Sequence, residues 1–244
     1  METLELKVNN IKLNCFEKSS FDKLSTLILY GKISDLKLSN VPFKNLNILT
    51  LSGADIHEID NFLEEVPFHK LTDLNLNNNK IELIDGLSKS HFYELNNLIL
   101  SNNKINNIDS LAQFSFTKLL LLDLRENNIE DIEILSKVNF FELKALVLSD
   151  NKIKNINVFS SVKFKNLASL YLDHNQIVNI SVLEKIPFIN LEYLKLSQNK
   201  IDNFYVFCSL PFKKITIYLD SFSFYRIFSL NMPKIENINF IKEY

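Results

Sequence analysis

The feature that most constrains this chain is an internal repeat. Six copies of one template follow each other at a spacing of 24 residues, and they begin at Leu71, Leu95, Leu119, Leu143, Leu167 and Leu191. Less regular copies precede them at Leu24 and Leu46, and a half copy begins at Leu4. Combined with a recurrent Phe, the copies give the consensus LxxLxLxxNxIxxIxxLxxVxFxx. A regular period of this length is typical of solenoids, in which each unit packs only against its neighbours.

The consensus predicts the path of the chain through one unit. Its Leu-x-Leu core alternates with a period of two residues, which indicates a short strand. The apolar residues that follow recur every three residues, a spacing that suits 3-10 or irregular helical turns. One unit cannot bury its apolar side alone, so stacked units share one core and their strands pair in parallel, about 4.8 Å apart. We therefore expect an α/β solenoid of about nine repeats, mostly of 24 residues.

Two further columns of the repeat are expected to be structural. An Asn follows each strand, where the backbone loses its ladder partners, and an inward amide can both donate to and accept from that backbone. This Asn ladder consists of Asn79, Asn103, Asn127, Asn151, Asn175 and Asn199. A Phe column stands three residues before each opening Leu or Ile and consists of Phe21, Phe43, Phe68, Phe92, Phe116, Phe140, Phe164, Phe188 and Phe212. These rings should stack as an aromatic spine along the convex side of the core.

In these residues the chain resembles the leucine-rich repeat family, over roughly residues 4 to 220. The stretch N-x-I-x-x-I-x-x-L is similar to the intracellular subclass typified by the repeat proteins that regulate protein phosphatase 1, although two additional residues stand before the Phe. The resemblance implies a horseshoe with a parallel β-sheet on its concave face and 3-10 or irregular turns on its convex side.

The end of the chain carries a second resemblance. It is similar to the segment that caps intracellular leucine-rich repeat proteins of the phosphatase-regulatory, spliceosomal and acidic nuclear groups, at Tyr225, Arg226, Leu230, Pro233, Ile235 and Ile238. An open apolar end would favour association, so a cover is needed there. We therefore expect a single domain over residues 1–244, with a capping half-repeat (1–23), repeats (24–221) and a C-terminal cap (222–244). A capped array is expected to be a monomer.

In such a horseshoe the variable positions beside the strand leucines project outward from the concave face, and a partner should bind there. Several of them are apolar or aromatic, which is the common composition of interface hot spots. Charged residues after the strands form a mildly acidic rim that can steer a basic partner. The expected partner-binding set is Ile99, Leu121, Asp123, Arg125, Val147, Tyr171, Asp173, His174, Tyr193 and Lys195. The alternative is that these residues only suit strands and a solvated rim.

Catalysis, metals and cofactors are not expected. The nearest hydrolytic constellation is Ser149, Asp150, Asp173 and His174, but an open sheet excludes little water and the chain has only 3 Gly for an oxyanion or phosphate loop. The 4 His are scattered, and no Cys-x-x-Cys or His-Glu-x-x-His spacing occurs. We expect no cofactor, no metal and no small-molecule substrate.

The remaining features restrict the class of partner. A formal charge of -2 offers no general attraction to nucleic acid or to an anionic membrane, although Lys80, Lys104, Lys152 and Lys200 form a possible basic stripe. The first residues contain no apolar signal segment, and Cys15 and Cys208 would lie too far apart to pair, which favours an intracellular protein, cytoplasmic or nuclear. The expected function is a non-catalytic adaptor that binds a protein. The alternative is an assembly subunit of a larger complex, including a ribonucleoprotein, held through its edges or its cap.

Overall fold

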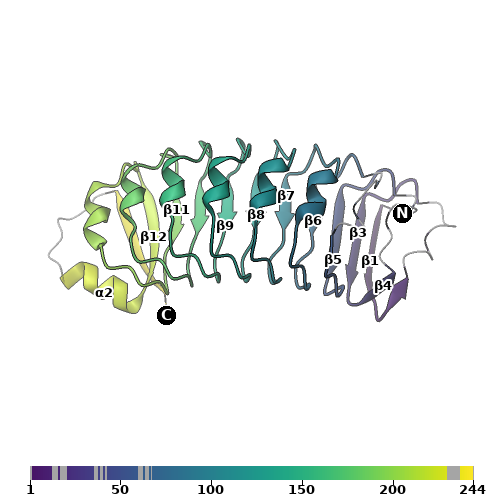
Figure 1. The fold of residues 1–244 in the computed structure, drawn as a ribbon, viewed down its shortest axis with the longest axis horizontal. Helices are drawn as coiled ribbons and strands as arrows, with labels where there is room; N and C mark the ends of the chain where they lie inside the picture. The colour runs from purple at the N-terminus through teal and green to yellow at the C-terminus, as the bar shows by residue number, and fades with distance from the viewer. Residues whose placement is uncertain are drawn as a thin grey trace.

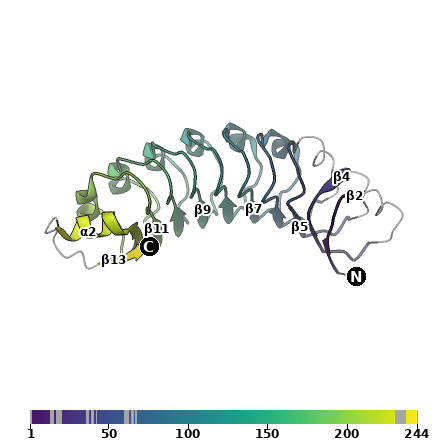
Figure 2. The same cartoon turned by 90° about the horizontal axis from the view of Figure 1, so that it is seen from below.

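The computed structural model describes residues 2–12, 16, 21–35, 38, 41, 43–59, 63, 66, 68–229 and 237–243. These residues form an arch whose inner side carries strands and whose outer side carries short helical turns (Figures 1 and 2). Within them, eleven parallel strands make one sheet in the order β1-β3-β5-β6-β7-β8-β9-β10-β11-β12-β13. A two-stranded sheet of β2 (Ile11–Lys12) and β4 (Ile33–Asp35) lies beside the N-terminal units.

The strands of the large sheet are short, as the period-two segment predicts. Their bounds are β1 Thr3–Lys7, β3 Thr26–Tyr30, β5 Ile48–Ser52, β6 Asp73–Asn75, β7 Asn97–Ile99, β8 Leu121–Asp123, β9 Ala145–Val147, β10 Ser169–Tyr171, β11 Tyr193–Lys195, β12 Ile215–Asp220 and β13 Ile238–Glu243. The register places equivalent residues side by side, so Leu122 pairs with Leu98 on one side and Leu146 on the other. These central leucines are fully buried, and the sheet confirms the predicted parallel pairing.

The return segments on the outer side are 3-10 helices. They are η2 Asp85–Lys89, η3 Asp109–Gln113, η4 Glu133–Ser136, η5 Asn157–Ser160, η6 Ser181–Glu184 and η7 Phe204–Ser209. Around η3 the buried apolar residues include Ile105, Ile108 and Leu111, and the spacing of three matches three residues per turn. The predicted solenoid, with a concave parallel sheet and a 3-10 convex side, is confirmed.

Each member of the Asn ladder connects its own unit to the preceding one. The Nδ2 of Asn127 donates to the carbonyl oxygens of Leu100 (3.1 Å) and Leu124 (3.0 Å), while its Oδ1 accepts the Ile105 N–H at 3.0 Å. The same three kinds of bond recur at Asn79, Asn103, Asn151, Asn175 and Asn199. The amide therefore satisfies donors and acceptors that the end of the strand leaves without ladder partners.

The residue before each ladder Asn has a left-handed backbone. These residues are Asn78, Asn102, Glu126, Asp150, His174 and Gln198, with φ between 52° and 55°. The left-handed residue turns the chain out of the strand so that the Asn side chain can enter the core. Asn and Asp tolerate this conformation, whereas Glu and Gln do so at a cost of about 1 kcal/mol.

The Phe column forms a buried row beside the turn that leads into each strand. The Phe116 carbonyl oxygen, for example, accepts the Leu119 N–H at 3.2 Å. Phe43 and Phe164 are fully buried, as are most other members. Among column members, ring contacts join Phe92 to Phe116, stacked at 6.4 Å, and Phe21 to Phe43, edge to face at 5.5 Å. The expected row of Phe rings is thus buried along most of its length, but only some neighbouring rings contact each other directly.

The C-terminal end departs from the repeat. Helix α2 (Ser221–Ser229) follows β12 directly, and β13 then pairs in parallel with β12 (Figure 2). Asp220 caps the helix, because its carboxylate accepts the N–H and the hydroxyl of Ser223 at 2.9 Å and 3.0 Å. Of the residues that carry the cap resemblance, Tyr225 and Arg226 lie on α2 and Ile238 begins β13, whereas Leu230, Pro233 and Ile235 lie outside the described residues, as does Cys15.

Candidate functional site

Seven of the ten predicted partner-binding residues occupy the two outward positions of the short strands on the concave face, while Arg125, Asp173 and His174 follow the strands. The first column runs through Asn97, Leu121, Ala145, Ser169 and Tyr193, and the second runs through Ile99, Asp123, Val147, Tyr171 and Lys195. Between them lies the buried Leu of each strand. Members of both columns are half-buried by their neighbours, and only Tyr193, at 42%, is exposed. The apolar members therefore stay outside the core and form part of a rigid surface.

A hollow of about 350 Å³ lies at the centre of this face. We call it the central hollow, and it is lined by Asp123, Arg125, Val147, Ser149, Asp150, Tyr171, Asp173, His174 and Lys195. Seven of the ten residues predicted for partner binding are in this lining, together with Ser149 and Asp150, which the sequence placed on the adjacent rim. The other three, Ile99, Leu121 and Tyr193, lie on the same face outside the hollow.

Hydrogen bonds hold several polar side chains of the central hollow in place. The Ser149 hydroxyl donates to Asp173 Oδ1 at 2.6 Å, and Asp123 Oδ1 accepts the Arg125 N–H at 3.0 Å. His174 Nδ1 lies 3.8 Å from Asp150 Oδ1. Because His174 and Asp150 belong to the left-handed column, their backbones are fixed by the turn that precedes the ladder Asn.

The carboxyl group of Asp123 is an unusual member of this lining. Burial against the neighbouring strands raises the pKa of Asp123 above its ordinary value, although the hydrogen bond and the charge of Arg125 act against that effect. No ion pair joins the Asp123 carboxylate to a cationic side chain among the described residues. Asp123 is therefore a partly desolvated acid at the wall of a hollow.

Lys195 closes one side of the central hollow and is bound by the C-terminal strand. Its Nζ lies 2.9 Å from Glu243 Oε1, 5.8 Å from the centre of the Tyr171 ring and 5.1 Å from that of Tyr218. The hydrogen bond that Lys195 donates to Glu243 raises the pKa of Lys195 despite burial. Burial also raises the pKa of Glu243, but hydrogen bonds from Ser197 and Lys195 outweigh it, so this pKa lies below its ordinary value.

The hydrolytic constellation that the sequence suggested is not assembled for that chemistry. In a Ser–His–Asp arrangement a histidine accepts the proton of the serine hydroxyl and an aspartate orients that histidine. The Ser149 hydroxyl instead donates to Asp173, and the ion-pair partner of His174 is Asp150. The part of the chain that the structure describes contains no group of three or more His, Cys, Asp or Glu able to hold a metal ion. No helix within that part is long and apolar enough to cross a membrane.

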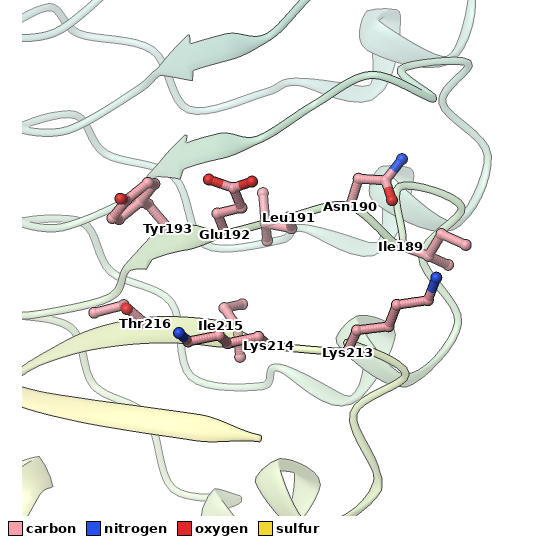
Figure 3. A pocket seen from close by; sticks show the side chains of 9 residues that line it. All are labelled: Ile189, Asn190, Leu191, Glu192, Tyr193, Lys213, Lys214, Ile215 and Thr216. Atoms are coloured by element: carbon pink, nitrogen blue, oxygen red, sulfur yellow. The ribbon is translucent and has the colours of Figure 1, made fainter. Parts of the chain in front are cut away.

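A second opening, of about 550 Å³, lies between the segments that lead into β11 and β12. Figure 3 shows the residues of the two segments on either side of it. It is lined by Ile189, Asn190, Leu191, Glu192, Tyr193, Lys213, Lys214, Ile215 and Thr216. Tyr193 thus belongs to this opening and not to the central hollow.

The opening results from a missing residue. Regular units have Leu-x-x-Leu before the middle of the strand, but the last unit has Ile215-x-Ile217. In the preceding unit Glu192 and Tyr193 both donate their N–H groups to the Ala168 carbonyl, whereas Thr216 alone donates to the Glu192 carbonyl. The shortened spacing was visible in the sequence and is the signal by which the opening could have been found.

Solved structures with this architecture are leucine-rich repeat proteins. An internalin (inlF) of Listeria monocytogenes matches 91% of the chain with 26% identity and a TM-score of 0.66, over 61% of its own length. A leucine-rich repeat protein of Leptospira interrogans matches 90% with 20% identity and a TM-score of 0.59, over 60% of its own length. A plant peptide hormone receptor, RGFR1, solved in complex with RGF2, matches 98% with 19% identity and a TM-score of 0.57, over 44% of its own length.

The matches to the Leptospira protein and to the plant receptor show a shared fold. This chain spans about three fifths of the length of the internalin. No protein-family model matches the chain, and no curated protein matches its sequence.

Proposed function

Because the chain is a leucine-rich repeat protein, we propose that it is a non-catalytic module that binds a protein partner on the concave face of its sheet. Leucine-rich repeat structures of this kind are typically interaction modules, and one of the similar structures is a receptor in complex with a peptide hormone. The observation that carries the proposal is the central hollow, which gathers an aromatic ring, an aliphatic side chain and five charged or ionisable residues of the predicted set.

The chemistry of the hollow supports binding more than catalysis. Rigid aromatic anchors beside charged groups are the usual composition of interface hot spots, and here Tyr171 and Val147 are held by strands paired on both sides. A site built on strands keeps its geometry when the partner is absent, which lowers the cost of ordering on binding. A serine hydrolase site would instead need a histidine that accepts from the serine hydroxyl, whereas Ser149 donates to Asp173 and His174 lies beside Asp150.

An affinity capture with two matched variants tests the proposal. One variant carries Val147→Asp with Tyr171→Asp in the central hollow. The control carries Val178→Asp with Tyr93→Asp, which changes the same residue types at exposed positions, 42% and 52%, outside the concave columns. The proposal expects a protein captured by the wild type and by the control to be lost from the hollow variant, at unchanged melting temperatures. If the hollow variant captures the same proteins as the control, the concave face is not the binding surface.

The second candidate is an assembly subunit held through its C-terminal end. The observation that favours it is a set of exposed aromatic side chains there: Phe222 (70%) and Tyr225 (61%) on α2 and Tyr205 (62%) on η7. Residues three apart lie on one side of a helix, so Phe222 and Tyr225 share one surface. A Phe222→Ser, Tyr225→Ser variant that loses a captured complex would support this candidate. RNA in that complex would be recognised by a steep decrease in binding with salt.

We also propose that the protein acts inside the cell, in the cytoplasm or nucleus, and that it is a monomer. These proposals rest on the sequence.

A further inference from the structure

The C-terminal strand supplies a charge to the wall of the central hollow. Glu243 lies at the end of β13, and its carboxylate reaches past β12 to Lys195 on β11, at 2.9 Å. The Ser197 hydroxyl donates to the other oxygen of the same carboxylate. Both side chains of the ion pair are about one third exposed, so the pair is partly shielded from solvent.

This pairing changes the charge balance of the hollow. Its lining contains three carboxylates, Asp123, Asp150 and Asp173, and two permanent cations, Arg125 and Lys195. Glu243 neutralises Lys195. The second cation, Arg125, has Glu126 beside it, with Nε and Oε1 3.7 Å apart. With these two glutamates counted, negative charge exceeds positive charge around the hollow, although the lining alone has nearly equal numbers of carboxylates and cations.

We propose that the central hollow receives an Arg or Lys side chain of the protein partner, and that Glu243 sets this preference by neutralising Lys195. The inference rests on the proposed function, because it specifies what the same surface binds. Glu243 is a positioning residue here, since it acts on the bound group only through Lys195.

The groups that would receive the cation are adjacent. Asp123 and Asp173 offer carboxylate oxygens within the same lining, beside the aliphatic side chain of Val147. Burial raises the pKa of Asp123, so a cation beside this acid would offset the cost of its desolvation. A partner's carboxylate would instead meet three acids and two cations, Arg125 and Lys195, that already have a glutamate beside them.

The test uses two labelled probes, a hexa-arginine and a hexa-glutamate peptide, and measures their affinities by fluorescence anisotropy. The quantity compared is the ratio of the two affinities. The wild type should prefer hexa-arginine. Glu243→Gln should reduce that preference roughly three- to tenfold, the effect expected of one unpaired charge near the site at partial screening. An Asp123→Asn, Asp173→Asn variant should lose most of the preference, because it removes the receiving carboxylates.

Two further variants separate the charge effect from a structural one. Lys195→Gln combined with Glu243→Gln removes both members of the pair and should restore the preference of the wild type. Glu130→Gln, an exposed acid on the segment that leads to η4, removes one negative charge away from the concave face and should leave the ratio unchanged. Melting temperatures confirm that each variant is folded.

Several outcomes would overturn the inference. They are a wild type without preference for hexa-arginine, a Glu243→Gln ratio that shifts no more than that of Glu130→Gln, and a double variant that stays at the Glu243→Gln ratio. If the Val147→Asp, Tyr171→Asp variant loses its captured partner while the ratios of peptide affinities do not shift, only this inference fails. If the ratios shift as expected while the hollow variant keeps its partner, only the proposed function fails.

Discussion

At the scale of single residues, each unit depends on one pair of neighbouring positions. The ladder Asn satisfies backbone groups of two units, and the residue before it turns the chain so that the amide can reach them. The first position was visible in the sequence because its residue type never varies in the regular units. The second position was not recognised, because Asn, Glu, Asp, His and Gln all occupy it. What these residues share is a positive φ, and the chemistry of their side chains differs.

This requirement predicts that Glu126→Asn stabilises the protein. Glu126 has φ 54°, a conformation that Asn adopts more easily, and its contact with Arg125 is exposed and contributes little. The free energy of unfolding should increase by about 0.5–1 kcal/mol. Urea denaturation measures it, with Glu130→Asn, outside the left-handed column, as the control that should show no gain.

At the scale of elements, the end of the array is held by Asp220. Besides capping α2, its carboxylate accepts the Gln198 N–H at 3.1 Å, so it connects the last strand to the preceding unit. Burial raises the pKa of Asp220, but the hydrogen bonds from Ser223 and Gln198 outweigh it and the pKa lies below the ordinary 3.8. A lowered pKa means that the folded protein favours the charged acid.

We expect Asp220→Ala to cost about 1–2 kcal/mol through the lost cap. The sign of its pH dependence follows from the lowered pKa: the contribution is present above the unfolded value of 3.8 and is lost as the pH falls through the lower, folded value. Urea denaturation of wild type and variant should therefore differ at about pH 6 and converge towards about pH 2. A difference that stays constant over this range would contradict the role of the ionised carboxylate.

At the scale of the whole molecule, the sheet and core are continuous, so stability depends on position in the array. Phe140 is fully buried with units on both sides, whereas Phe21 is only half-buried near the N-terminal end. Phe140→Ala should cost about 3–5 kcal/mol and Phe21→Ala distinctly less. In the Phe140→Ala variant, the backbone amides of the units on both sides of residue 140 should exchange hydrogen faster than in the wild type. Equal costs at both positions would contradict a core shared between neighbours.

Much of this architecture could be predicted from the sequence, because each repeat places the same types of residue at the same buried positions. The parallel register and the 3-10 turns follow from the period, and the concave location of residues such as Tyr171 follows from the resemblance to leucine-rich repeat proteins. The one-residue shortening before Ile217 was visible in the sequence, but the consensus does not show that a separate opening beside Tyr193 accompanies it. The contact between Lys195 and Glu243 was equally out of reach, because it joins a repeat to a segment outside the period.

The order in which the ribosome delivers the chain gives this contact a further meaning. Every residue that lines the central hollow lies between positions 123 and 195, so its shape can form while the rest is still being made. The 48 residues that separate Lys195 from Glu243 take a few seconds more at about 5–20 residues per second. During those seconds the lysine has not yet met its carboxylate, and a nascent chain presents a differently charged face from the finished protein.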